Sequence, residues 1–189
     1  MSSDFKSARF WARALLEGAV YPGARAIDAT AGNGHDALWL SQRVGETGCV
    51  HVFDVQEKAL ANTRALLEAH KLADRAQLIL SGHEAMETYV AEPVDAIVFN
   101  LGWLPGGMRD VTTRVETTLC AAAAGTRLLK EAGLMTICIY PGHDEGAREL
   151  AALTHWASAL DPAQFDVMLH CYLNQKNDPP QMIAVRRRG

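Results

Sequence analysis

Acidic residues, glycines and an asparagine follow one another in residues 25–40 (RAIDATAGNGHDALWL), in an order that suits a nucleoside ligand. The segment has the pattern of a strand that ends at Asp28, a glycine-bearing turn around Asn33 and the start of a helix. A second predicted strand, residues 49–54, ends in another acid, Asp54. Two strand-end acids with a glycine turn between them are typical of a nucleoside-binding cleft, which lies beyond the carboxyl ends of parallel strands.

The charges around the turn distinguish between two kinds of nucleoside ligand. Residues 32–37 (GNGHDA) match the dinucleotide pattern G-x-G-x-x-G/A. A dinucleotide would place its pyrophosphate at the helix N-terminus, where Asp36 in the first turn and Asp28 just upstream would repel it. S-adenosylmethionine has no phosphate, and its sulfonium, α-ammonium and ribose diol suit carboxylates. The sequence therefore favours this methyl donor, with expected contacts at Asp28, Asn33, His35, Asp36 and Asp54.

Further donor contacts are predicted at the ends of the second and third strands, and several contacts have structural alternatives. Gln56 is placed to reach the ribose or the adenine edge, or to bond the N-terminus of its own helix. Gly82 and His83 follow the third strand, where backbone N–H groups can bind adenine and His83 can stack or hydrogen-bond; His83 could equally be structural. Asp36 could simply cap its helix, and Asn33 could simply adopt a left-handed turn.

Two later strand-end loops could hold a methyl acceptor. In the first loop the carbonyl of Asn100, which we also expect to contact the donor, can accept a hydrogen bond from an acceptor amine, while Trp103 and Pro105 can contact a planar base. A rigid Gly/Pro turn with a packed Trp103 is the alternative. In the second loop Tyr140 is expected to face the same cleft, and His143 is the candidate proton acceptor because an unperturbed histidine has a pKa of about 6.5. His143 could instead belong to the first turn of the next helix.

The elements that must position these loops alternate between strands and helices. After a leading helix we expect seven strands, with continuously apolar strands such as residues 95–100 that require helices on both faces of the sheet. Residues 174–180 are too short for a crossover helix, so the last two strands should form an antiparallel hairpin. The predicted fold is a single α/β domain over residues 1–189, Rossmann-like, with a mostly parallel sheet. The leading helix lies near 4–17; the strands lie near 24–28, 49–54, 76–80, 94–99, 133–140, 165–172 and 181–187; the other helices lie near 36–44, 56–70, 83–90, 113–130 and 143–159.

Composition limits the classes of partner. The chain has 189 residues and a net charge of −4, which argues against broad electrostatic wrapping of nucleic acid but allows a short RNA stem on a local basic patch. No apolar run approaches the roughly 18 residues that span a bilayer, and the charged N-terminus is no secretory signal. The four cysteines form no C-x-x-C pair, so we interpret them as buried thiols in a reducing cytoplasm, without metal or disulfide roles.

Five ordered motifs, DATAGNGHD, FDVQ, NLGWLPGG, YPGHDEG and NQKNDPP, resemble the rRNA methylase-like family of bacterial tRNA wobble-uridine methyltransferases. The resemblance covers nearly the whole chain, with Trp103 at an expected Tyr and Pro141 at an expected His. It implies a class I methyltransferase fold, S-adenosylmethionine as donor, and methylation of 5-aminomethyl-2-thiouridine in the tRNA anticodon region. It also implies a homodimer, and donor contacts at Asn33, Asp36, Asp54, Gln56, Gly82 and His83.

The leading hypothesis is therefore a cytoplasmic, S-adenosylmethionine-dependent N-methyltransferase that acts on an exocyclic amine of tRNA, without metal, DNA or membrane partners. Two alternatives stay open on the residues alone. Modest acidity favours a methyltransferase for a small-molecule amine, and the G-x-G-x-x-A pattern leaves a dinucleotide-binding oxidoreductase or nucleotide sensor. Spacing and charge by themselves lead only to methyl transfer; the tRNA substrate comes from the resemblance.

Overall fold

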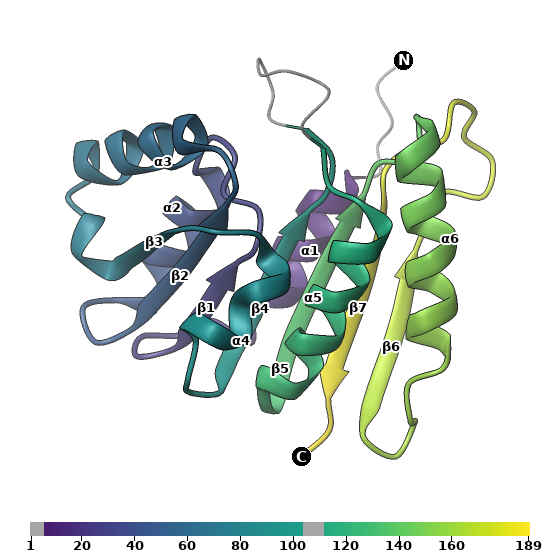
Figure 1. The fold of residues 1–189 in the computed structure, drawn as a ribbon. Helices are drawn as coiled ribbons and strands as arrows, with labels where there is room; N and C mark the ends of the chain where they lie inside the picture. Colours follow the sequence, from purple (N-terminus) through teal and green to yellow (C-terminus); the bar gives the residue numbers. More distant parts are fainter. Residues whose placement is uncertain (1–5, 104–111) are drawn as a thin grey trace.

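The computed structural model describes residues 6–103 and 112–189, and they build one twisted sheet with helices on both faces (Figure 1). The strand order is β3-β2-β1-β4-β5-β7-β6. The first five strands are parallel, and β7 runs antiparallel to both β5 and β6. The strands are β1 (Arg25–Asp28), β2 (Cys49–Asp54), β3 (Ala76–Leu80), β4 (Val94–Asn100), β5 (Leu129–Ile139), β6 (Phe165–His170) and β7 (Gln181–Arg187). The predicted Rossmann-like fold with a C-terminal antiparallel hairpin is confirmed.

Alternate residues of the central strands point to opposite faces, so each face has its own apolar core. On one face, Ala26 and Val98 belong to a buried cluster with residues of α1 (Ala8–Leu16) and α2 (His35–Val44), and α3 (Glu57–Ala69) adds Leu60 at its margin. On the other face, Ile27 and Phe99 pack in a cluster with residues of α4 (Met86–Tyr89), α5 (Val115–Leu128) and α6 (Asp144–Ser158). Burial on both sides explains why these strands are continuously apolar.

Some boundaries differ from the prediction. The expected helix near 83–90 is a 3₁₀ turn, η2 (His83–Ala85), followed by the single turn of α4; a second 3₁₀ turn, η1 (Ala73–Arg75), precedes β3. Strand β5 starts at Leu129, earlier than expected, because Leu129 pairs with Val94 and is fully buried. A register irregularity follows in this pairing, and Ala132 adopts a left-handed conformation (φ 60°). The local sequence pattern did not predict this irregularity inside an 11-residue strand, so the expected strand began after it.

The cysteine prediction is only partly right. All four cysteines are free, but Cys138 alone is buried; Cys120 is exposed, and Cys49 and Cys171 are half-buried. Cys120 lies on the outer side of α5, where an apolar sequence context did not imply burial. Among the described residues, no helix is both long and apolar enough to cross a membrane.

Candidate functional site

A cavity of about 500 Å³ lies at the carboxyl ends of the parallel strands. It lies where β1 and β4 are neighbours although β2 and β3 separate them in sequence, so the connections leave in opposite directions. Ligands of open α/β sheets bind at such a switch point, and the volume lies in the range of small-molecule sites. Eleven predicted site residues line the cavity: Asn33, His35, Asp36, Asp54, Gln56, Gly82, His83, Asn100, Trp103, Tyr140 and His143. Pro105 lies outside the described residues.

The turn after β1 is held close to α3. Gly34 has a left-handed conformation (φ 80°), and a Cβ added to it would lie 2.8 Å from Cα of Thr63, so a side chain is excluded both by conformation and by space. Asn33 accepts a hydrogen bond from Nδ2 of Asn62 at 3.0 Å. Neighbouring elements therefore determine the shape of the glycine turn.

Asp54, at the end of β2, joins this turn to α3. Its two carboxylate oxygens accept hydrogen bonds from the backbone N–H groups of Gly32 (3.0 Å) and Gln56 (2.9 Å). Gln56 precedes α3, but its side chain makes no capping bond to that helix and lines the cavity. The structural alternative for Gln56 is therefore not observed, and Asp54 serves the loop as well as the cavity wall.

His83 has both a structural bond and a place on the cavity wall. Its Nδ1 lies 3.2 Å from the carbonyl oxygen of Ala29, and because a carbonyl only accepts, the ring proton is on Nδ1. Burial lowers the pKa of His83 below its ordinary value, and its ring packs edge-on against Phe99. The neutral imidazole keeps the lone pair of Nε2 as an acceptor. Gly82, which starts this turn, also lines the cavity.

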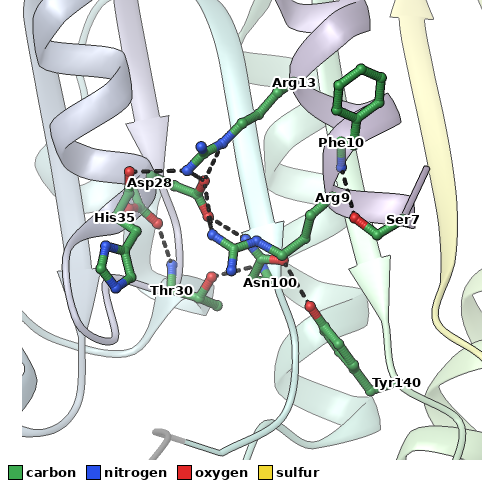
Figure 2. Close-up of polar contacts among 10 residues, drawn as sticks. Ser7, Arg9, Phe10, Arg13, Asp28, Thr30, His35, Asn100 and Tyr140 are labelled. Carbon is green, nitrogen blue, oxygen red and sulfur yellow. Dashed lines mark hydrogen bonds and ion pairs between the residues drawn. The ribbon is translucent and has the colours of Figure 1, made fainter. Parts of the chain in front are cut away.

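Asp36 is paired with two arginines of α1, Arg9 and Arg13, which local sequence pattern did not indicate. Figure 2 shows both arginine side chains reaching from α1 toward the turn that carries His35. Arg13 donates to Oδ1 of Asp36 from Nη2 (2.7 Å) and from Nε (3.1 Å). Arg9 donates through Nη2 at 3.3 and 3.4 Å. The two arginines are four positions apart on an amphipathic helix, and this spacing indicates that they lie on the same face of the helix. Asp36 is therefore not the uncompensated negative charge that the sequence argument assumed.

Asp28 also differs from the expectation of a cavity-facing carboxylate. It is fully buried beneath the turn, does not line the cavity, and its Oδ1 accepts from the N–H of Thr30 at 3.1 Å. Its Oδ2 has no hydrogen-bond partner among the described residues. Burial, followed by the nearby charge of Asp36, raises the pKa of Asp28 to about 8, so the group is mostly protonated at neutral pH. Asp54 is left as a cavity carboxylate with no arginine partner in the described chain.

The side chain of Asn100 is held in one orientation. Its Nδ2 donates to Oδ2 of Asp36, and because a carboxylate only accepts, the amide oxygen must point the other way. That oxygen lies 3.5 Å from the hydroxyl of Tyr140, whose pKa burial raises to about 12, so the phenol stays protonated. The backbone N–H of Asn100 donates to Oγ1 of Thr30 at 2.7 Å.

Trp103 and His143 place two rings side by side on the cavity wall, with centroids 4.8 Å apart and planes at 55°. His143 is also the N-cap of α6, and its Nδ1 accepts from the N–H of Gly146 at 3.1 Å. A neutral ring with this bond carries its proton on Nε2, so it has no free lone pair for a second proton. The role of proton acceptor stays a prediction for His143, and this geometry favours capping.

A buried acid, Glu149, holds the start and end of the loop after β4, where we expect the methyl acceptor to bind. No local pattern in the sequence indicated this residue. Glu149 is fully buried and accepts hydrogen bonds from the hydroxyls of Thr118 (2.8 Å) and Thr113 (3.1 Å). The Oγ1 of Thr113 in turn accepts from the N–H of Gly102 at 2.8 Å. Glu149 occupies an ordinary helical position in the sequence, so only the packing of α6 against α5 shows this role.

The fold and the cavity are those of a class I S-adenosylmethionine-dependent methyltransferase, and the comparisons with known proteins agree. Residues 50–186 match the family described as "Putative rRNA methylase", and the chain belongs to this family. A chloroplastic tRNA (mnm(5)s(2)U34)-methyltransferase of Arabidopsis thaliana is 32% identical over 96% of this chain and 70% of its own length. These matches decide between the two classes that the glycine pattern left open: the chain belongs to a methyltransferase family and not to the dinucleotide-binding oxidoreductases.

Two solved structures are similar over nearly their whole length. One, described as a "putative rRNA-methylase" of Clostridium thermocellum, has a TM-score of 0.95 and 37% identity, and covers 98% of this chain and 100% of its own. A methyltransferase of Streptococcus mutans, solved in complex with S-adenosylhomocysteine (SAH), has a TM-score of 0.88 and 36% identity, and covers 97% and 99%. The fold therefore belongs with methyltransferases, as the sequence predicted.

Proposed function

We propose that this protein transfers a methyl group from S-adenosylmethionine to the aminomethyl nitrogen of 5-aminomethyl-(2-thio)uridine at the wobble position of tRNA. The observation that carries the proposal is the orientation of Asn100, whose amide oxygen is turned away from Asp36 at the switch point of the sheet. An acceptor oxygen held there suits the N–H of an amine. The name of the Arabidopsis relative supports the choice of substrate.

The residues of the cavity wall, taken in the order β3, β2, β1 and β4 of the sheet, match successive parts of the donor. Near β3, Gly82 and the acceptor Nε2 of His83 suit the amino edge of adenine, while Asp54 and Gln56 near β2 suit the ribose diol. Between β1 and β4 lie the remaining predicted donor contacts, Asn33, His35, Asp36 and Asn100.

The residues of this chain have mainly a positioning role. When bound, S-adenosylmethionine would supply a methyl group that its sulfonium already activates: the carbon–sulfur bond breaks as the carbon–nitrogen bond forms, SAH leaves, and the surplus proton of the methylated amine passes to solvent. Asn100 orients the acceptor nitrogen through its amide oxygen, and Trp103 stacks the uracil beside His143. Tyr140 places its hydroxyl beside the amide oxygen of Asn100, and the hydroxyl stays protonated because burial raises its pKa to about 12. In-line positioning of the two reactants supplies most of the expected rate enhancement.

We further propose that the protein acts as a homodimer on the anticodon region, in the cytoplasm. Strand β6 is the edge of the sheet, and its Val167, Met168 and Leu169 are all exposed. Exposed apolar residues on an edge strand are typical of a surface that another chain covers. The free cysteines suit a reducing compartment. Light scattering gives the molar mass of wild type and of Met168→Asp in solution. The proposal predicts a dimer for wild type and a monomer for the variant.

The decisive experiment compares tRNA nucleosides from cells with and without the gene by mass spectrometry. The proposal predicts that 5-methylaminomethyl-2-thiouridine disappears, that its aminomethyl precursor accumulates, and that purified protein with S-adenosylmethionine restores the methylated form. Unchanged nucleosides would contradict the tRNA substrate. Methylation of a free amine in that case would support the alternative, a small-molecule amine methyltransferase, for which the modest acidity of the chain is the favouring observation.

A further inference from the structure

The side chain of Arg9 extends from α1 toward Asn100 (Figure 2). It lines the cavity and forms an ion pair with Asp36. It is 41% exposed, and its hydrogen bonds to described residues all go through Nη2, at 3.3 and 3.4 Å from the Asp36 oxygens. Arg13 binds the same carboxylate at 2.7 Å and does not line this cavity. Arg13 therefore holds Asp36 tightly, while Arg9 holds it loosely and presents the rest of its guanidinium to the cavity.

Arg9 and Asp36 together place a positive and a negative group next to each other on the wall. This pair matches a zwitterion, with a carboxylate on the guanidinium and an ammonium on Asp36. A phosphate could also bind Arg9, but it offers no N–H donor to Asp36 and would satisfy only one member of the pair. The arrangement therefore favours an α-amino acid group over a phosphate.

We propose that Arg9 binds the α-carboxylate of the amino-acid tail of S-adenosylmethionine. The inference rests on the donor of the proposed function and adds the residue that holds its tail. The strand order supports the placement: His83 lies after β3, Asp54 ends β2, and the Arg9–Asp36 pair lies over β1 and β4. A donor with adenine and ribose at the first two positions extends its tail toward the third. The site also selects for donors that carry the carboxylate.

The binding of three ligands can distinguish a contact between Arg9 and the carboxylate from a role of Arg9 in maintaining the shape of the cavity. S-adenosylmethionine carries the whole tail, decarboxylated S-adenosylmethionine keeps the sulfonium and ammonium but lacks the carboxylate, and 5′-methylthioadenosine lacks the tail. In calorimetry, Arg9→Ala should raise the Kd of S-adenosylmethionine about tenfold, the scale of a lost charged hydrogen bond at a partly exposed site. The Kd values of the other two ligands should stay near those of wild type, and Arg9→Lys should recover part of the loss.

Arg13→Ala is the matched control, because it removes the other arginine of Asp36 without removing a group that faces the cavity. It should leave the ratio of the Kd values of S-adenosylmethionine and its decarboxylated form unchanged. Equal losses for all three ligands in Arg9→Ala would overturn the proposal, because Arg9 would then support only the shape of the cavity. Unchanged donor affinity with weaker tRNA binding would also overturn it, by assigning Arg9 to an acceptor phosphate. Wild-type protein that binds none of the three ligands would instead refute the donor itself.

Discussion

The side-chain amide of Asn100 donates a hydrogen bond to the carboxylate of Asp36, which lies 64 residues away in the chain. Asp36 is held in turn by Arg9 and Arg13, so α1, the turn after β1 and the end of β4 meet at one carboxylate. Because this contact determines which way the Asn100 oxygen points, residues that were expected to bind the donor also orient the proposed acceptor site.

Replacing Asn100 by Ala should reduce methylation by about 100-fold while SAH affinity falls far less, because Asn100 is one of several predicted donor contacts and misplacement of a reacting group is costly even when binding is retained. Tyr140→Phe, which removes only the hydroxyl beside the Asn100 oxygen, should have a smaller effect. Single-turnover methylation and calorimetry measure the two quantities. Unchanged turnover in Asn100→Ala would remove Asn100 from the proposed mechanism.

Replacing Asp54 by Ala should weaken S-adenosylmethionine binding by roughly 1.5–3 kcal/mol, the scale of a lost hydrogen bond to a charged group. The variant should also unfold more easily, because the N–H groups of Gly32 and Gln56 lose their acceptor. Calorimetry and urea unfolding separate the two effects. Glu57→Ala is the matched control, since Glu57 is a nearby exposed acid off the cavity wall. Normal affinity in Asp54→Ala would refute the ribose assignment.

The pKa of Asp28, raised from 3.8 to about 8, predicts a pH dependence of stability. Below about pH 4 the group is protonated in both the folded and the unfolded chain. Between about pH 4 and pH 8 the unfolded chain releases the proton while the folded chain keeps it, so the free energy of unfolding falls as pH rises.

Asp28→Asn removes this titration and keeps an acceptor for the N–H of Thr30. The difference in Tm between Asp28→Asn and wild type should therefore shift in favour of the variant across this window. Parallel Tm curves from pH 4 to pH 8 would show that Asp28 titrates normally.

The capping role of His143 can be separated from a proton-transfer role by one substitution. Asn is a good N-cap, so His143→Asn should keep the thermal stability of α6, whereas His143→Ala should lose about 1 kcal/mol. Because Nδ1 of His143 already accepts from Gly146, we expect His143→Asn to retain the pH profile of kcat. Loss of the acidic limb of that profile, with stability intact, would support the imidazole as proton acceptor.

Glu149 should matter for stability through its two threonine partners. Glu149→Ala leaves the hydroxyls of buried Thr118 and half-buried Thr113 without an acceptor and should cost about 1–3 kcal/mol in urea unfolding. Burial raises the pKa of Glu149, which favours its neutral form, so Glu149→Gln should be much better tolerated. Thr113→Val, which removes the hydroxyl that links Gly102 to Glu149 but keeps the bond from Thr118, should be intermediate. Equal stability of Glu149→Ala and wild type would contradict this role.

The strand-end loops could be located from the sequence because periodicity and glycine placement are local properties. Asp54, His83, Asn100 and His143 were each expected at the end of a strand, and all four line the cavity. Parallel strands bring their carboxyl ends to one edge, so knowing the strands was enough to gather these residues. The predicted class is correct, but the charges of Asp28 and Asp36 from which it was argued are not: Asp28 is mostly protonated and Asp36 is paired with two arginines, and the family comparisons establish the class.

The sequence by itself therefore determined the fold, the place of the cavity and eleven residues on its wall, but it missed Arg9 and wrongly placed Asp28 there. Tertiary structure alone decided their charge and hydrogen-bonding states: Asp36 is paired with Arg9 and Arg13, Asp28 is mostly protonated, and the proton of neutral His143 is on Nε2. The physical reason is that desolvation and hydrogen bonding depend on groups distant in sequence, whereas strand and turn formation depends on neighbours. A carboxylate in a motif is only a candidate charge until its partners are known.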